Sequence, residues 1–277
     1  MNTSVLQFLS QLTEKEGIWY STSTGAISYP EEGNAICFQL EEHSYWFTHR
    51  NDCFAYLINK YGNKGLFADI GGGNGFVSAR LQEEGHQVVL IEPGQIGCRN
   101  AKKRGIENVV CARLEDIEWA KGELQNVGVF DVVEHIEDHD GFLKTIHSAL
   151  AENGKLFISV PSFQHLWSED DKDGGHYRRY THKSMAQLLK TTGFEVLYSN
   201  YCFAALHLPI YLFRTLPSKL GLRKNPVKNV AKEHGTEKGF LVQWIMKLLK
   251  VELSKIQRGK QIPFGSSLVI VAIKRTL

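Results

Sequence analysis

Short apolar runs alternate with amphipathic stretches along the middle of the chain. The runs of strand length lie at residues 65–70, 87–91, 108–111, 126–130, 155–160 and 194–200. The stretches with helical spacing of apolar positions lie between them, at residues 76–84, 96–104 and 141–150. Strands that alternate with helices predict a parallel sheet whose connections are helical crossovers.

The pattern changes at both ends of this middle part. Residues 1–62 are rich in aromatic side chains, and we expect them to form a helical cap that ends in a helix over residues 40–61. Residues 63–203 form the predicted core. Residues 204–262 predict a helical, basic insertion, and residues 263–277 contain the final strand of the core, at 266–274.

Composition narrows the class of protein without naming it. The chain has 277 residues and a formal net charge of +2, which is too small to indicate nucleic-acid binding by itself. Its five cysteines are scattered and form no Cys-x-x-Cys pair, so we expect neither a disulfide framework nor a thiolate zinc site. The first residues lack the layout of a secretory signal, and the longest apolar segment, residues 201–213, is too short to cross a bilayer. We therefore expect a cytoplasmic protein.

A glycine-rich turn follows the first predicted strand of the core. Its sequence is Asp69-Ile70-Gly71-Gly72-Gly73-Asn74-Gly75, and it leads directly into a predicted helix. Glycines at such a turn permit unusual backbone angles and the close approach of a ligand. A turn for NAD needs Gly-x-Gly-x-x-Gly, but Phe76 occupies the last position when the count begins at Gly71. The pattern Asp-x-Gly-x-Gly-x-Gly fits throughout and disfavours a dehydrogenase.

An acidic residue ends the next predicted strand. Glu92 lies seventeen residues after Gly75, where a carboxylate can accept both ribose hydroxyls of a nucleoside. Asp69, beneath the loop, can serve a cationic amino-acid end. Strand, glycine loop, helix, strand and terminal acid in this order predict the pocket of S-adenosylmethionine.

The chain resembles class I S-adenosylmethionine-dependent methyltransferases across residues 65–203. It especially resembles a subgroup with an Asp-Val-x-Glu-His-Ile motif, here at residues 131–136, and a Gly-His-Tyr-Arg-Arg-Tyr motif, here at residues 175–180. The segment Tyr45-Trp46-Phe47-Thr48-His49-Arg50 is similar to the N-terminal helix of that subgroup. The resemblance implies an α/β fold with a Rossmann-like, seven-stranded methyltransferase sheet. We expect the cofactor to contact Asp69, Gly71, Gly73, Gly75, Glu92, Leu114, Glu115 and Phe130.

Asp131, Glu134 and His135 follow the fourth predicted strand, and their spacing would place them on one face of a helical turn. His135 could be a general base for a hydroxyl acceptor, since imidazole titrates near neutral pH. By resemblance to the ubiquinone-pathway O-methyltransferases and the small-RNA 2′-O-methyltransferases, Asp131, Glu134, His135 and His176 could instead bind a divalent metal. In a third interpretation, these side chains only organise the pocket. His135 and His176 are the candidate catalytic residues.

Other residues are candidates for the acceptor side. We expect Trp46, Trp167, Tyr177 and Arg178 to contact substrate, with Arg178 and Arg179 able to clamp an anionic group. Further aromatic residues, Trp19, Tyr20, Tyr29 and Tyr45, could wall the cavity or belong to the core.

These residues predict methylation of a small-molecule acceptor, with O-methylation favoured. The alternatives are an enzyme similar to RNA 2′-O-methyltransferases, one that methylates a lipid-linked acceptor, and a non-catalytic cofactor-binding protein. No RNA-binding module is recognisable, so we do not expect nucleic acid as a partner. The insertion at 204–262 carries an apolar stripe with helical spacing between lysines, a pattern that also occurs where a helix contacts a membrane surface.

Overall fold

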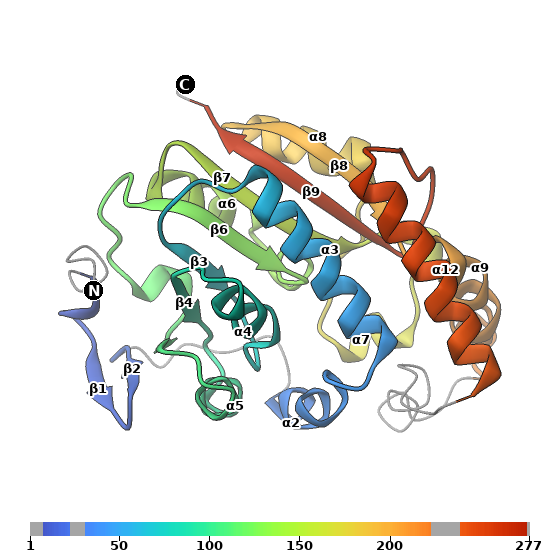
Figure 1. The fold of residues 1–277 in the computed structure, drawn as a ribbon, viewed down its shortest axis with the longest axis horizontal. Coiled ribbons are helices and arrows are strands. Elements are labelled where there is room, and N and C mark those ends of the chain that lie inside the picture. Colours follow the sequence, from blue (N-terminus) through green and yellow to red (C-terminus); the bar gives the residue numbers. More distant parts are fainter. Residues whose placement is uncertain (1–7, 23–30, 223–238, 276–277) are drawn as a thin grey trace.

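The computed structural model describes residues 8–22, 31–222 and 239–275. One nine-stranded sheet organises them, in the order β1-β2-β5-β4-β3-β6-β7-β9-β8. Helices cover both faces of this sheet, with α3 on one face and α6 and α8 on the other (Figure 1). The described chain therefore has the α/β, Rossmann-like architecture that the sequence predicts.

The centre of the sheet is parallel. Its strands are β3 (Phe67–Ile70), β4 (Val88–Ile91), β5 (Asn108–Cys111), β6 (Leu124–Phe130) and β7 (Leu150–Pro161). Beyond β7, the last strand of the chain, β9 (Ser267–Lys274), inserts antiparallel between β7 and β8 (Phe194–Cys202). All residues of β3 and β4 are buried, as expected for strands that helices cover on both faces.

The sheet has nine strands where the sequence predicted seven. The two additional strands, β1 (Thr13–Lys15) and β2 (Ile18–Tyr20), form a hairpin, and β2 pairs in parallel with β5. Ile18 is buried in a cluster with residues of β4, α5 and β5. Part of the predicted helical cap therefore extends the sheet, because this buried contact covers its edge.

The crossover helices are α4 (Phe76–Glu83), α5 (Gln95–Lys103), α6 (His139–Ala149) and α8 (His182–Thr191). Helices α4, α5 and α6 begin and end within two residues of the three predicted helices. Helix α8 was not predicted. Short helical turns, η1 (Leu114–Asp116), η2 (Val133–His135), η3 (Gln164–Leu166) and α7 (Glu169–Asp173), follow strand ends. These connections carry much of the site described below.

The helix predicted over residues 40–61 is present, but it begins five residues later, at Tyr45. The structure has α2 (Glu31–Leu40) and α3 (Tyr45–Tyr61), separated by a turn. Ser44 has an extended backbone, and its hydroxyl accepts a hydrogen bond from the backbone N–H of Trp46 at 3.2 Å, so it caps α3. This cap explains why α3 begins at Tyr45 and is separate from α2.

Among the described residues between β8 and β9, four segments are helical: α9 (Ala204–Ile210), the π-helical turn η4 (Tyr211–Thr215), α10 (Leu216–Lys219) and α12 (Phe240–Gln257). Glu252 fixes α12 to the body. Its carboxylate accepts hydrogen bonds from the backbone N–H groups of Phe203 and Ala204 at 2.6 and 2.7 Å and lies 2.9 Å from Nε2 of His49 in α3. No helix within the described ranges is long and apolar enough to cross a membrane. The division into cap, core and insertion stays a prediction.

Candidate functional site

A cavity of about 520 Å³ lies where the parallel strands end. The final residues of four strands line it: Ile70 of β3, Ile91 of β4, Phe130 of β6 and Pro161 of β7. In an open parallel sheet the carboxyl ends of the strands form such a crevice, because the loops that follow them diverge.

The glycine loop between β3 and α4 forms one wall of the cavity. Gly71 has φ of 70°, and a Cβ atom there would stand 2.5 Å from Cγ2 of Val132. Gly75 caps α4 in the left-handed conformation, and a Cβ atom there would lie 3.1 Å from the side chains of Ala101 and Ile106. A side chain at Gly71 would collide with Val132, and one at Gly75 would crowd its neighbours in a backbone conformation that side chains rarely adopt, so the loop requires glycine.

Glu92 fixes the glycine loop from the end of β4. Its carboxylate accepts hydrogen bonds from the N–H of Gly73 at 3.0 Å and of Gly94 at 2.8 Å. The side chain is buried and lines the cavity. A carboxylate can accept about four hydrogen bonds, which is more than these two.

Asp69 lies beneath the loop. It is 1% exposed, and the hydroxyl of Ser78 donates to its carboxylate at 2.6 Å. Burial raises the pKa of Asp69 to about 6. The cavity lining includes Asp69, Gly71, Gly73, Glu92, Leu114, Glu115 and Phe130, whereas Gly75 caps α4 without lining it.

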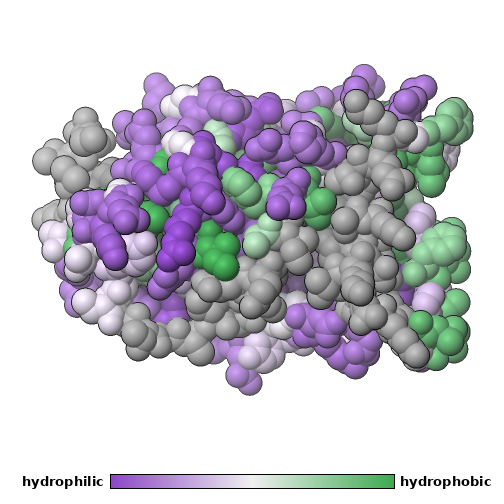
Figure 2. All heavy atoms as spheres, turned by 90° about the horizontal axis from the view of Figure 1, so that it is seen from below, coloured by the Kyte–Doolittle hydropathy of each residue, from purple (hydrophilic) through white to green (hydrophobic). Residues whose placement is uncertain are grey.

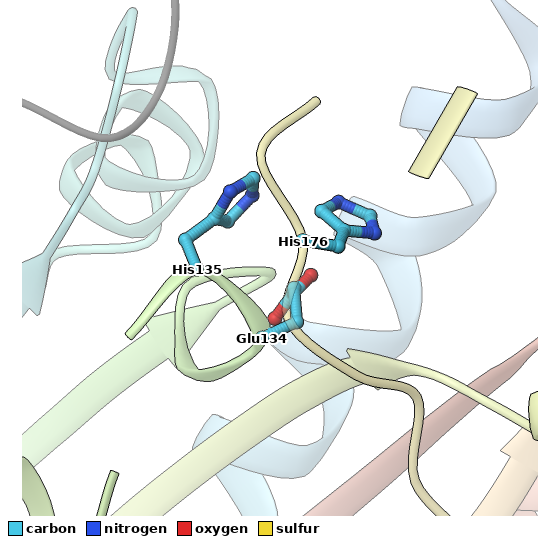
Figure 3. A group of neighbouring side chains, drawn as sticks. All are labelled: Glu134, His135 and His176. Atoms are coloured by element: carbon cyan, nitrogen blue, oxygen red, sulfur yellow. The ribbon is translucent and has the colours of Figure 1, made fainter. Parts of the chain in front are cut away.

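Three donor side chains converge in the same cavity (Figure 3). Glu134 and His135 belong to η2, directly after β6, and His176 lies in the loop after α7. One potential ligand atom from each lies within 4.8 Å of the others. Glu134 is 1% exposed, and its Oε2 has no hydrogen-bond partner among the described residues. A buried, unpartnered carboxylate oxygen between two imidazoles is typical of a cation site.

The surroundings of the three donors set their charge. Burial, and next the charge of Asp131, raises the pKa of Glu134 well above its usual value. Burial, and next the neighbouring His176, lowers the pKa of His135 to about 4. His135 is therefore a neutral imidazole at neutral pH, the form that binds metals, and it has little affinity for a proton.

A carboxylate orients His176 from behind. Nδ1 of His176 lies 2.9 Å from Oδ1 of Asp171, which leaves Nε2 available. Arg179 holds both oxygens of Asp171 at 2.8 and 2.9 Å. Burial raises the pKa of Asp171, but the hydrogen bond from His176 and the charge of Arg179 outweigh burial and bring this pKa below its usual value.

Asp131 is not part of this group. Its backbone has φ of 58°, and η2 is a 3-10 turn, so the helical turn expected to align Asp131, Glu134 and His135 does not form. Instead, Asp131 forms an ion pair with Arg50 and accepts a hydrogen bond from the hydroxyl of Ser159 at 2.8 Å. The left-handed residue redirects the chain after β6 and turns the Asp131 carboxylate toward α3.

Of the four expected substrate residues, the cavity lining within the described chain includes Trp46 and excludes Trp167, Tyr177 and Arg178. The Trp46 ring stacks on Phe203, with centroids 3.8 Å apart. Tyr177 is 49% exposed, and Arg178 donates to the backbone oxygen of Glu137 at 3.0 Å.

The other residues considered for the acceptor side are also placed. Arg179 lines the cavity, whereas Trp19 and Tyr20 lie in β2 and, like Tyr45, do not. Tyr29 falls outside the described residues.

Arg50 is a site residue that the sequence analysis missed. It extends from α3 into the cavity lining, its side chain is 16% exposed, and it lies over the ring of Phe47 at 5.1 Å. Its place at the end of the motif at residues 45–50 was the one available signal. Nothing in that motif alone reveals that Arg50 pairs with Asp131, 81 residues later.

A family model described as a methyltransferase domain matches residues 39–199. The chain belongs to this methyltransferase family. The match spans α3, the glycine loop, Glu92 and the three-donor group, and the predicted class of S-adenosylmethionine-dependent methyltransferases is confirmed. No curated protein matches the chain.

Solved structures share the fold at low sequence identity. A possible histamine N-methyltransferase of Thermotoga maritima is 15% identical, with a TM-score of 0.55 over 88% of this chain and 95% of that one. An S-adenosylmethionine-dependent methyltransferase of Archaeoglobus fulgidus is 16% identical, with a TM-score of 0.54 over 87% and 98%. Phosphoethanolamine N-methyltransferase 2 of Haemonchus contortus is 18% identical, with a TM-score of 0.51 over 82% of this chain and 53% of that one. This chain thus spans about half the length of the Haemonchus protein.

Proposed function

We propose that this methyltransferase transfers the methyl group of S-adenosylmethionine to an oxygen atom of a small-molecule acceptor. The observation that carries the proposal is the convergence of Glu134, His135 and His176 in the cavity that the glycine loop also lines. An amine acceptor needs little beyond alignment, because its lone pair is already nucleophilic. A hydroxyl acceptor must lose a proton, and a buried cluster of polar donors is useful for that task.

On the cofactor side, three charged groups match three parts of S-adenosylmethionine. The Glu92 carboxylate suits the ribose hydroxyls. Asp69 suits the amino group of the methionine end. Arg50, a partly buried cation that lines the cavity, suits its carboxylate, and the ion pair with Asp131 orients the guanidinium for this contact.

The three donors fit a divalent cation better than His135 fits a general base. An imidazole with a pKa of about 4 takes up a proton poorly at neutral pH. By contrast, a neutral His135, a His176 oriented by Asp171 and an unpartnered oxygen of Glu134 form a mixed nitrogen and oxygen ligand set. A divalent cation bound there would lower the pKa of an acceptor hydroxyl.

The remaining task of the protein is to align the acceptor with the methyl group. The sulfonium already activates the methyl group, so the rate depends on holding the acceptor oxygen in line with the carbon–sulfur bond. As the oxygen–carbon bond forms, the carbon–sulfur bond breaks, the hydroxyl proton passes to solvent and S-adenosylhomocysteine leaves. Trp46, whose ring stacks on the buried ring of Phe203, gives the cavity a firmly held apolar wall.

The similar folds do not select an acceptor. The Haemonchus contortus enzyme was solved with phosphomonomethylethanolamine, and a geranyl diphosphate C-methyltransferase of Streptomyces coelicolor, 12% identical with a TM-score of 0.52, was solved with Mg²⁺ and a diphosphate analogue. They methylate nitrogen and carbon on one scaffold, so the acceptor atom depends on the residues that line the cavity.

The test combines labelled S-adenosylmethionine, acceptor pools and mass spectrometry, which reports the acceptor and the methylated atom together. His135→Ala is expected to lower turnover by about a hundredfold to ten-thousandfold, while affinity for S-adenosylhomocysteine changes less than threefold. EDTA should abolish activity, and Mg²⁺ or Mn²⁺ should restore it. His43→Ala, which alters an exposed histidine in the turn between α2 and α3, is the matched control.

Three results would each overturn part of the proposal. Full activity after chelation would exclude the metal. Wild-type turnover in His135→Ala, or a product methylated only on nitrogen or carbon, would exclude the proposed role of the cluster in O-methylation.

A further inference from the structure

The helical segment between β8 and β9 carries most of the exposed apolar surface of the described chain. Fourteen large hydrophobic residues are exposed, and eleven of them belong to residues 204–222 and 239–257. We call these eleven the apolar face: Leu208, Leu212, Phe213, Leu216, Leu220, Leu222, Phe240, Leu241, Trp244, Met246 and Val251. In Figure 2, hydrophobic residues gather along one edge of the molecule. Such concentration marks an interaction surface, since apolar residues on ordinary surfaces are scattered.

Helix α12 separates a buried side from an outward side. Leu249 and Ile256 are buried against the body, and Glu252 anchors the same side. Phe240 and Trp244 are 87% and 54% exposed and stand one helical turn apart on the opposite side. The helix is therefore held firmly on one side, while large apolar rings point outward on the other.

Cations accompany these rings, and acids are almost absent. Within residues 204–222 and 239–261, the one acidic residue is Glu252, which is buried and engaged by backbone N–H groups. The cations of the same two ranges are Arg214, Lys219, Lys247, Lys250, Lys255, Arg258 and Lys260. Lys247 and Lys255 are exposed and lie beside the outward line of Phe240 and Trp244 on the helix surface. The face is thus both apolar and positively charged.

The apolar face continues to the cavity. Ile210 and Arg214, from α9 and η4, line the cavity, while Leu212 and Phe213, between them in sequence, are exposed. One turn of chain therefore contributes to both the cavity wall and the outer surface.

We infer that the apolar face docks on the surface of a membrane that contains anionic lipids. Outward Trp and Phe with flanking lysines, and with no exposed acid in residues 204–222 and 239–261, match the interface between headgroups and acyl chains. A protein partner would need acidic groups to match these lysines, whereas an anionic bilayer supplies negative charge across the whole surface. Docking in this way places the cavity beside the lipid interface. This further consequence, that the acceptor is an amphiphile with a polar methylated group, rests on the proposed function.

Vesicle flotation of the full chain tests the docking independently of catalysis. Wild-type protein is expected to float with vesicles of phosphatidylcholine and phosphatidylglycerol, and not with phosphatidylcholine alone. Removing the two charges in Lys247→Gln/Lys255→Gln should weaken binding about 25-fold at low salt, at about fivefold for each lysine. Phe240→Gln/Trp244→Gln should weaken it at least tenfold.

Matched variants control for surface changes in general. Lys121→Gln/Lys144→Gln removes two exposed lysines elsewhere, and Leu197→Gln removes an exposed apolar residue of β8. Both should float like wild type, and all variants should unfold at the wild-type temperature, since the altered residues are exposed.

Absence of flotation by wild type, or equal flotation by all variants, would overturn the inference. Self-association that Phe240→Gln/Trp244→Gln abolishes, without vesicle binding, would assign the face to a second copy of the chain. If flotation holds and O-methylation fails, the docking stands and the proposed function does not.

Discussion

Replacing Glu92 by alanine tests the cofactor side most directly. In the structure, the Glu92 carboxylate accepts two backbone hydrogen bonds, from Gly73 at 3.0 Å and Gly94 at 2.8 Å, and it lines the cavity. The substitution therefore removes the expected ribose acceptor and two supports of the glycine loop. The two effects have different magnitudes and can be measured separately.

The substitution should reduce the free energy of cofactor binding more than the free energy of unfolding. Two hydrogen bonds from ribose hydroxyls to a carboxylate contribute roughly 1.5–3 kcal/mol each. Their loss corresponds to an affinity at least about a hundredfold weaker. The two backbone N–H groups lie beside a cavity that water can enter, so the loss of stability should be about 1–3 kcal/mol.

Calorimetry with S-adenosylhomocysteine measures the affinity, and urea unfolding without ligand measures the stability. Glu92→Gln keeps the side-chain volume and one acceptor oxygen, so its affinity for S-adenosylhomocysteine should lie between those of wild type and Glu92→Ala. Glu118→Ala, at an exposed position, is the control. A folded Glu92→Ala variant that binds within threefold of wild type would refute the assignment of Glu92 to the ribose.

Two further predictions concern buried carboxyl groups. Burial raises the pKa of Asp69 to about 6, so the charged form that attracts the cofactor's amino group predominates above that pH. Affinity for S-adenosylmethionine should therefore fall below pH 6, by up to about tenfold per pH unit. Calorimetry should find this fall in wild type and not in Asp69→Asn. A flat wild-type profile would contradict this role. Glu252→Ala removes the contacts of Glu252 with His49, Phe203 and Ala204, so urea unfolding should show a loss of stability of roughly 3 kcal/mol. Glu118→Ala, at an exposed position, should change nothing measurable. Equal unfolding midpoints of Glu252→Ala and wild type would show that water or a rearranged helix α12 replaces these contacts.

The sequence alone predicted the central sheet and the cofactor loop, because both depend on local patterns. Strands β3, β4 and β5 begin and end within two residues of the predicted positions. Burial on both faces requires continuous apolar runs, and such runs can be recognised without knowledge of the fold. The glycine loop was equally visible, since the backbone angles at Gly71 and Gly75 admit few other residues.

Local patterns failed where a partner distant in sequence decides the structure. The beginning of α3 is an exception, since its cap, Ser44, is a local signal that the prediction overlooked. In contrast, β1 and β2 join the sheet because β5, far away in sequence, offers an edge. Residues 13–20 are too few to indicate by themselves that this pairing occurs.

At the site, the sequence supplied the residue types and the tertiary structure decided their grouping. Glu134 and His135 meet His176, 41 residues later, because the loop after α7 returns to the end of β6, where the N–H of Tyr177 donates to the backbone oxygen of Glu134 at 2.8 Å. Asp131 leaves that group because its left-handed backbone directs it toward Arg50. The charge of each donor is likewise a tertiary property, since burial, which no sequence spacing encodes, lowers the pKa of His135 and raises that of Glu134.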